Sequence, residues 1–408
     1  MGNKLVLKEV EFEKYTGEEI AFAIASAASQ MNFSYACWRL PNVNALNVLV
    51  DFSIETNKKK AILENTEKGF VLQSFVQKDK FDTIFLTASI YFSSQTKELI
   101  EKKSSENNEL KELFLKRVID TLKSKSFGIK LFDSDVTIAS NAEEHYKKLI
   151  GKAKKAIQEN RFKKIVLARS KQIENNSLEI TIFPIIKSLI DGFPNALVSL
   201  VYSKETGTWL TASPEVLASI DSDGIFKTIA LAGTQLLNPG DTIQKASWSQ
   251  KEIEEQALVS RYIINCFKKI RLREYEEEGP RTVQSGNLLH LRTDYSVNTK
   301  EVNFPELGTV MLELLHPTSA VCGMPKEVTL EFINEHEGLD RKLFSGYLGP
   351  INIDGASNIF VNLRCANLFA DKAVLYAGAG VTQDSEPEKE FLETELKMEA
   401  VGNFLRSL

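Results

Sequence analysis

Three side chains near the C-terminal end of the sequence have the chemistry to bind a metal and an anion. Glu390, Glu393 and Lys397 recur at helical spacing, which places two carboxylates and an amine on one stripe. Before them comes Gly378-Ala379-Gly380, a predicted bend whose backbone N–H groups can hold an anion. Carboxylates beside an anion favour a magnesium ion between them. A solvent-exposed helix with an ordinary ladder of ion pairs explains this stretch alone equally well.

These groups must be positioned by a strand, a bend and an acidic helix within residues 373–400. Ser385 followed by Glu388 fits a capping box, and Pro387 suits the first turn of a helix, where a missing N–H costs nothing. The sequence therefore predicts a helix that begins near Glu386.

A further carboxylate is predicted on the buried face of another helix. This helix begins after a capping box at Ser249 and runs to about Ile270, and Glu255 falls on the same apolar stripe as Val259 and Tyr262. A carboxylate there needs a partner, and a cation, a buried basic residue or a water-filled crevice would each satisfy it.

A β-hairpin is expected to bring a guanidinium to the predicted bend. Ile359–Phe369 has the pattern of one strand and precedes the strand that enters the bend. If Asp371 and Lys372 form a two-residue loop, the ladder places Arg364 opposite Ala379. A shift of one residue in this register would turn the arginine to the other face of the sheet.

The composition is that of a globular protein with a small-molecule ligand. The 408 residues are 43% hydrophobic and 26% charged, and the net charge of −5 argues against binding to nucleic acid or an anionic membrane. The widely spaced cysteines predict buried, reduced thiols and no zinc cluster; they are Cys37, Cys266, Cys322 and Cys365. No segment has the length and apolarity of a signal peptide or a membrane span, so we expect a cytoplasmic protein.

The order of the predicted elements favours an α+β fold, because strands and helices do not alternate regularly. We expect residues 1–140 to form a variable N-terminal half of the same fold, and residues 141–408 to form the catalytic region. The expected helices include Glu18–Met31, Leu110–Ser126, Asn141–Gln158 and Thr181–Ile190, the last with Pro184 in its first turn, and the expected strands include Asn47–Ile54, Phe70–Val76 and Asp82–Phe92.

Seven motifs in order resemble those of the chorismate-utilising enzymes, which include isochorismate, salicylate and aminodeoxychorismate synthases and anthranilate synthase component I. The motifs are RFKKIVLARS, LTASPEVLAS, IALAGT, KEIEEQALV, LLHLRT, LHPTSAVCGMPKEVTLEFINEHE and LYAGAGVTQDSEPEKEFLETELK. The likeness covers about residues 145–400. It implies one large domain of two layered antiparallel β-sheets with helices packed outside, chorismate as substrate and dependence on Mg²⁺.

Two positions distinguish the members of this family. Members that add water to the ring resemble this chain in having lysine at Lys164, whereas those that add ammonia usually have glutamine. A desolvated lysine near a metal can act as a base towards water, which an amide cannot do. Aminodeoxychorismate synthases carry a nucleophilic lysine at the position of Ala232, and alanine cannot form a covalent intermediate. The combination resembles isochorismate synthase.

The resemblance also implies the remaining roles. Glu215 would be the general acid that protonates the departing C4 hydroxyl while Lys164 activates the water that attacks C2 from the other face of the ring. Such an acid needs a pKa raised by burial. His290 resembles the family histidine near the C4 hydroxyl, although a buried structural histidine has the same signature.

By the same resemblance, Glu255 and Glu393 would bind Mg²⁺, with Glu390 supporting them through metal-bound waters. The substrate carboxylates would be bound by the following residues: Thr234, Arg364, Gly378, Ala379, Gly380 and Lys397.

The expected function is therefore a magnesium-dependent isochorismate synthase that acts as a monomer without an amidotransferase subunit. Salicylate synthase is the nearest alternative, followed by anthranilate synthase component I and a non-catalytic chorismate-binding protein. Two residues depart from the family pattern, since Gln235 replaces the usual arginine after AGT and Gln256 replaces the usual histidine after the metal-binding glutamate.

Overall fold

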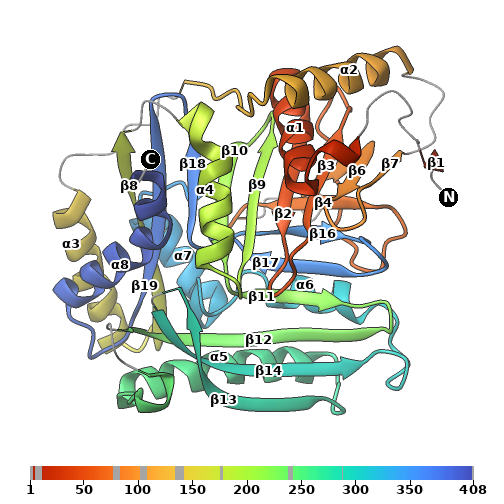
Figure 1. Ribbon diagram of the computed structural model, residues 1–408. Coiled ribbons are helices and arrows are strands. Elements are labelled where there is room, and N and C mark those ends of the chain that lie inside the picture. Colours follow the sequence, from red (N-terminus) through yellow and green to blue (C-terminus); the bar gives the residue numbers. More distant parts are fainter. Residues whose placement is uncertain are drawn as a thin grey trace.

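The computed structural model describes residues 3–4, 12–76, 83–101, 108–133, 142–174, 178–237, 242–286 and 288–406. In these ranges the chain forms two antiparallel β-sheets with helices packed around them, which confirms the predicted α+β fold (Figure 1). The helices are α1 (Gly17–Gln30), α2 (Asn108–Ser124), α3 (Ala142–Gln158), α4 (Leu178–Gly192), α5 (Gln250–Lys269), α6 (Leu307–Leu315), α7 (Lys326–His336) and α8 (Pro387–Arg406), with short 3-10 turns η1 (Phe12–Lys14) and η2 (Ile243–Lys245).

Each sheet takes strands from both the N-terminal and the C-terminal part of the chain. The first sheet has the order β1 (Asn3–Lys4), β7 (Glu98–Glu101), β6 (Ile90–Ser93), β3 (Leu46–Asp51), β2 (Ser34–Arg39), β9 (Leu197–Ser203), β10 (Gly207–Ser213), β18 (Cys365–Leu368), β19 (Lys372–Val381), β8 (Lys164–Glu174) and β15 (Gly323–Met324). The second has the order β13 (Glu276–Ser285), β14 (Leu288–Asn298), β12 (Ile225–Leu236), β11 (Val216–Ile220), β17 (Ser357–Val361), β16 (Tyr347–Ile351), β4 (Gly69–Gln73) and β5 (Ile84–Thr87).

Large apolar side chains fill the space between the two sheets. Trp38 and Trp209 of the first sheet belong to one buried cluster with Phe70 and Leu348 of the second. The outer faces are covered by helices, with α1 and α4 against the first sheet and α5 and α6 against the second (Figure 1). This layering buries both faces of the central strands. Polar side chains on these strands can therefore reach a cavity only at the strand ends, where the sheets and helices leave space.

Two segments that were predicted as single strands each divide between the two sheets. The predicted strand 82–92 forms β5 in the second sheet and β6 in the first, while its residue 82 lies outside the described part of the chain. Likewise, the predicted strand 359–369 forms β17 and β18, with a break at Arg364, whose φ is 47°. An alternating pattern does not reveal such a crossing, because both strands have the same two-residue period.

The ends of the helices agree with the predictions only in part. The capping box of α5 is present, since the Ser249 N–H donates to the Glu252 carboxylate at 2.7 Å. At α8 it is absent, because the Ser385 hydroxyl accepts the N–H of Thr382 at 3.0 Å, although Pro387 does begin the helix. Pro184 lies inside α4, because this helix begins earlier than predicted.

Two further expectations can be compared with the described part of the chain. All four cysteines are buried and free of disulfides, as predicted. Each helix in the described ranges is too short or too polar to cross a lipid bilayer.

A buried ion pair fixes the end of β8 to the loop that follows α6. The Arg341 guanidinium contacts Glu337 at 2.6 Å, and both side chains are almost fully buried. Arg341 also donates to the carbonyls of Val166 and Val321 at 2.9 and 2.8 Å, while Glu337 accepts the Ala168 N–H at 2.8 Å. One ion pair thus satisfies backbone groups of two segments that line the cavity described below.

Replacing Arg341 by methionine should strongly destabilise the protein, because the Glu337 carboxylate would remain buried without its counter-ion. We expect urea unfolding to report a loss of about 3–5 kcal/mol. The same change at Arg406, whose ion pair with Glu399 is partly exposed, is the control and should cost under about 1 kcal/mol. Equal losses for the two variants would contradict this role of Arg341.

Candidate active site

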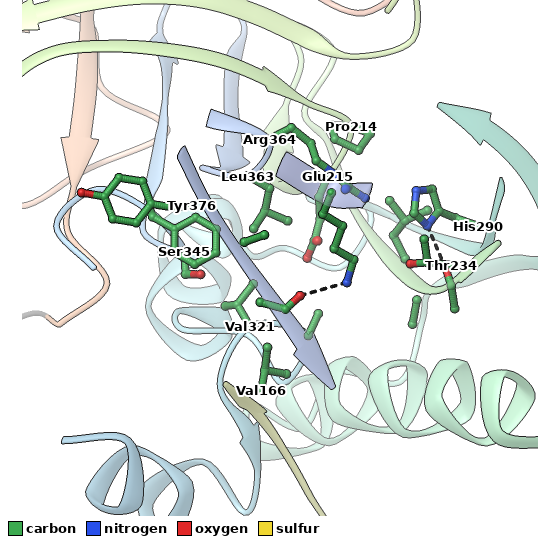
Figure 2. A pocket seen from close by; sticks show the side chains of 18 of the residues that line it. Val166, Pro214, Glu215, Thr234, His290, Val321, Ser345, Leu363, Arg364 and Tyr376 are labelled. Atoms are coloured by element: carbon green, nitrogen blue, oxygen red, sulfur yellow. Dashed lines mark hydrogen bonds between the residues drawn. The ribbon is translucent and has the colours of Figure 1, made fainter. Parts of the chain in front are cut away.

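A cavity with about 690 Å³ of empty space, its open mouth included, lies where the ends of β8, β12, β14 and β19 approach α5 and α8 (Figure 2). Most of the predicted site residues line it. The lining side chains and backbone include Glu215, Ala232, Thr234, Glu255, His290, Arg364, Gly378 and Lys397, together with apolar groups such as Val166, Leu231, Val321 and Leu363.

Glu215 is a carboxyl group that the fold removes from water. It lies in the short link between β10 and β11, and only 4% of its surface is exposed. Burial raises its pKa to about 7, against the opposing attraction of Lys164, Lys397 and Arg364. The side chain therefore keeps a proton close to neutral pH, as the sequence-based role of a general acid requires.

His290 on β14 is held as a neutral imidazole. Its Nδ1 lies 2.7 Å from the carbonyl oxygen of Gly233, which can only accept, so Nδ1 carries the proton. Burial and the neighbouring charge of Arg364 lower the pKa of His290 to about 3. Its Nε2 is buried and has no hydrogen-bond partner within the described residues, so it is free to accept a hydrogen bond from a ligand.

The histidine is positioned by an irregularity in β12. The pairing of β12 with β14 shifts between Ala232 and Gln235, and Gly233 has a φ of 70°. This β-bulge turns the Gly233 carbonyl towards His290 and brings Thr234 to the cavity wall. The glycine is required because its backbone conformation is one that other residues rarely adopt.

Arg364 reaches the cavity by a different route from the one predicted. Cys365 pairs with Tyr376, so the register differs by two residues from the prediction and brings Arg364 to the level of Ala377. Burial lowers the pKa of Arg364 to about 10, and its Nη1 has no partner among the described residues. A buried guanidinium with an unused N–H is a strong binding group for a carboxylate.

Lys164 and Glu255 form an ion pair across the cavity wall. Lys164 is 1% exposed, and its Nζ donates to Glu255 Oε1 at 2.7 Å. Burial disfavours the charged form of Glu255, but the attraction of Lys164 outweighs it and lowers the pKa of this carboxyl. Of the partners that the sequence left open for Glu255, the structure contains the buried basic residue.

The predicted bend at Gly378-Ala379-Gly380 is wrong, because β19 continues through it and pairs with β8 as far as Val381. The glycines make room instead. A Cβ atom on Gly380 would lie 2.8 Å from Glu255 Oε1 and 3.1 Å from Lys164 Cε. Beyond Tyr376 no pairing of β19 with β18 is seen in the described residues, so the Gly378 carbonyl is free to accept Lys397 Nζ at 3.0 Å.

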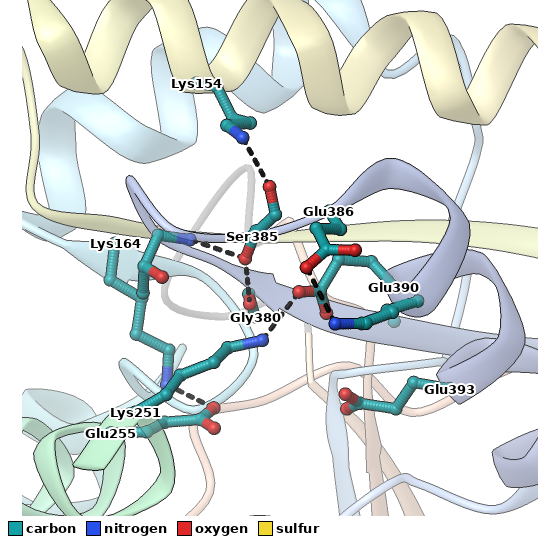
Figure 3. A network of polar contacts seen from close by, with 12 residues as sticks. Lys154, Lys164, Lys251, Glu255, Gly380, Ser385, Glu386, Glu390 and Glu393 are labelled. Carbon is teal, nitrogen blue, oxygen red and sulfur yellow. Dashed lines mark hydrogen bonds and ion pairs between the residues drawn. The ribbon is translucent and has the colours of Figure 1, made fainter. Parts of the chain in front are cut away.

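Two further lysine–glutamate pairs lie beside this one, and Figure 3 shows that of Lys251 and Glu390. Lys397 Nζ contacts Glu393 Oε1 at 2.6 Å along α8, which confirms the predicted stripe. Lys251 Nζ contacts Glu390 Oε1 at 2.6 Å and so joins α5 to α8. Burial and the like charge of Glu393 raise the pKa of Glu390.

The donor chemistry of this region fits a magnesium ion, although no complete cage is present. Among the described residues, no three acidic, histidine or cysteine side chains are arranged to hold a metal by themselves. Magnesium commonly uses only one or two carboxylates and takes its other ligands from waters and substrate. Glu390 is almost fully buried and its Oε2 has no partner in the described residues, which is the type of oxygen that a hydrated cation would satisfy.

The two departures from the family pattern have structural roles. Gln256 donates to the Ala230 carbonyl at 3.2 Å and to Thr293 Oγ1 at 3.0 Å, and thereby fastens α5 to the second sheet. Gln235 donates to Glu252 at 3.0 Å, beside the start of α5. Neither amide takes the place of a predicted catalytic side chain.

Lys251 is the site residue that the sequence predictions missed. It lies four residues before Glu255, on the same side of α5, and this spacing was a usable signal. A second signal was a cation in the first turn of a helix, where the helix dipole disfavours it. Two predicted substrate-binding residues, Ala379 and Gly380, are buried in β19 and do not line the cavity. The predicted residues Lys164, Glu390 and Glu393 also lie outside its lining.

Comparison with known proteins gives a family match and several relatives. A family model described as chorismate binding enzyme matches residues 39–406. Isochorismate synthase EntC of Escherichia coli K12 is 30% identical over 202 residues, which are 48% of this chain and 51% of that protein. Isochorismate synthase MenF of Bacillus subtilis is 29% identical over 274 residues, 65% of this chain and 57% of the relative. The matched part thus spans about half the length of these relatives.

Solved structures share the fold over nearly the whole chain. The menaquinone-specific isochorismate synthase MenF of Escherichia coli superposes with a TM-score of 0.72 at 20% identity, covering 100% of this chain and 94% of that one. Anthranilate synthase component I of Streptococcus pneumoniae gives a TM-score of 0.63 at 18% identity, covering 90% and 89%. At these identities the likeness establishes the fold alone.

The raised pKa of Glu215 predicts a pH dependence of stability that Glu215→Gln should abolish. Between pH 4.5 and about 7 the folded protein binds more protons at this site than the unfolded chain, so the stability of the wild type falls as pH rises. Relative to the wild type, the variant should gain up to about 3 kcal/mol across this window. Urea unfolding at several pH values measures this difference in stability. Glu331→Gln, on the exposed face of α7, is the control and should follow the wild type. If stability varied with pH in the same way for Glu215→Gln and the wild type, the prediction would be contradicted.

Proposed function

We propose, from the premise that this chain belongs to the family of chorismate binding enzymes, that it is an isochorismate synthase. The reaction adds water at C2 of chorismate and releases the C4 hydroxyl. The main support is Glu215, a buried carboxyl whose pKa of about 7 lets it donate a proton in a cavity that also holds cationic groups for an anionic substrate.

Chorismate carries two carboxylates, and the cavity offers cationic groups for both. Arg364 would bind one of them through its unpartnered Nη1 and the adjacent N–H groups. Lys397 would act on the other as a point charge, next to the unpaired edge of β19 at Gly378. Thr234 on the bulge of β12 lies in the same wall and can add a hydroxyl hydrogen bond.

The reaction needs a base on one face of the ring and an acid on the other. In the proposed mechanism, Lys164 takes a proton from the attacking water as its oxygen forms the bond to C2. Both ring double bonds shift, from C1–C2 to C1–C6 and from C5–C6 to C4–C5, as the bond from C4 to oxygen breaks. Glu215 gives its proton to the departing oxygen, which leaves as water. One water is consumed and one released, and the two side chains exchange their protons with solvent before the next cycle.

His290 would orient the group that leaves. Its neutral imidazole presents an unprotonated Nε2, which can accept the hydrogen bond of a substrate hydroxyl but cannot donate one. This would fix the hydroxyl so that its oxygen lone pairs remain available to the proton of Glu215. We therefore assign His290 to the positioning of the C4 hydroxyl.

A magnesium ion is proposed at Glu255 and Glu393, with Glu390 supporting it through waters. When bound, it would supply a positive charge that fixes and polarises the ring carboxylate of chorismate. We further propose a cytoplasmic monomer that works without an amidotransferase subunit, since water rather than ammonia is the nucleophile.

Incubation of the purified protein with chorismate should give isochorismate without pyruvate or salicylate, and EDTA should abolish the product. Lys164→Ala and Glu215→Gln should each lower kcat by at least about a hundredfold, because each removes one of the proton-transfer groups. Chromatography of the products measures both effects. The controls are Lys163→Ala, which changes the exposed lysine next to Lys164, and Glu331→Gln.

Other products would favour the related functions. Salicylate with an equal amount of pyruvate would assign the chain as a salicylate synthase, and anthranilate formed in the presence of ammonium would assign it to the ammonia-adding members. Saturable binding of chorismate with no product under any condition would leave a non-catalytic binding protein.

A further inference from the structure

A lysine side chain enters the group of carboxylates that the proposed function assigns to magnesium. Lys251 lies in the first turn of α5, and its Nζ is 2.6 Å from Oε1 of Glu390 on α8. Glu390 is 1% exposed and has no other cation in contact with it among the described residues. Lys251 is therefore the counter-ion that allows this carboxylate to be buried.

The ammonium group of Lys251 is also attracted by the carboxylates of Glu255 and Glu393. Figure 3 shows Lys251 extending between Glu255 and Glu390, with Glu393 on the far side. Burial lowers the pKa of Lys251, but the attraction of Glu390, followed by that of Glu393 and Glu255, outweighs this effect and leaves the pKa raised. The ammonium group of Lys251 thus lies close to three carboxylates, two of which, Glu255 and Glu393, also have lysine partners of their own.

Of the three lysines in this region, Lys251 has the easiest path to solvent. Its side chain is 35% exposed, whereas those of Lys164 and Lys397 are 1% and 19% exposed. Its four-carbon stem is attached at the start of α5, so a change of rotamer can carry the ammonium group into water without moving the backbone. Lys164 and Lys397 lie deeper and contact the cavity or its wall.

Because Lys251 lies in the first turn of α5, its ammonium group stays beside Glu390 only through the attraction of the carboxylates. The first turn of a helix carries a partial positive charge, which repels a cation and favours an acidic residue such as Glu252. Away from Glu390 the ammonium group would gain water as a partner and lose this repulsion. The balance between its two positions therefore depends on how much negative charge the carboxylates present.

We propose that Lys251 is a tethered cation that occupies the position of the metal in the metal-free protein and leaves for solvent when a divalent cation binds. The inference rests on the proposed function only through its metal-binding carboxylates. Lys251 and the hydrated metal compete for the negative charge of the same three carboxylates, so the lysine stabilises this group when no metal is bound and weakens metal affinity. Lys251 would be a positioning residue that makes no contact with substrate.

The inference is tested by titrating substrate-free protein with Mn²⁺ and following free Mn²⁺ by electron paramagnetic resonance, which does not depend on activity. Lys251→Met removes the charge and keeps most of the stem. We expect this variant to bind Mn²⁺ roughly tenfold more tightly than the wild type, because one charge-assisted hydrogen bond no longer opposes binding. Mn²⁺ should also raise the Tm of the variant more than that of the wild type.

Matched variants separate competition from a general effect of charge. Lys268→Met makes the same change at an exposed lysine in the last turn of α5 and should leave Mn²⁺ affinity unchanged. Lys251→Arg keeps a cation and should retain weak binding. Lys251→Gln replaces Lys251→Met if the latter does not fold, and the same gain in affinity is expected.

The outcomes distinguish this inference from the proposed function. Unchanged or weaker Mn²⁺ binding by Lys251→Met, in a protein whose wild type makes isochorismate with Mg²⁺, would overturn the competition and leave the proposed function standing. An equal gain for Lys268→Met would also overturn it, because it would show only the loss of overall positive charge. If no variant binds Mn²⁺, both the metal site and this inference fail.

Discussion

The structure depends on the compensation of charges that are buried between the two sheets. The ion pair of Lys164 and Glu255 joins β8 of the first sheet to α5, which Gln256 fastens to the second sheet. The charge of Lys164, which is 1% exposed, could not be buried without a partner except at a cost of several kcal/mol, so the pair helps to hold β8 against α5. Gly380 makes room for the contact, because a Cβ atom there would collide with Glu255 and press on Lys164.

Burial away from water also sets the protonation states of two polar side chains in the cavity, Glu215 and His290. Burial raises the pKa of Glu215 and lowers that of His290, so both side chains are driven towards their neutral forms near pH 7. One is then a proton donor and the other a hydrogen-bond acceptor. Cations such as Arg364 remain charged beside them, which gives an anionic ligand a binding site without the need for further ionisable groups.

The sequence predicted the chemical groups of the site better than their geometry. The motifs identified the family, and the helical spacing correctly paired Glu393 with Lys397. The predicted glycine bend was wrong, because a run of glycines has the same pattern whether it turns the chain or makes room for neighbours. The hairpin register was also wrong by two residues, since it depended on a guessed loop at Asp371 and Lys372.

The sequence by itself determined the α+β class, the family and the residue types that meet in the cavity, because these follow from local periodicity and from motifs of a few residues. Tertiary structure alone decided that Lys164 pairs with Glu255 and that Lys251 enters the group of carboxylates. It also decided how strongly water is excluded around Glu215. These properties depend on distances and burial between segments far apart in the chain, and such long-range relations leave no periodic signal in a single sequence.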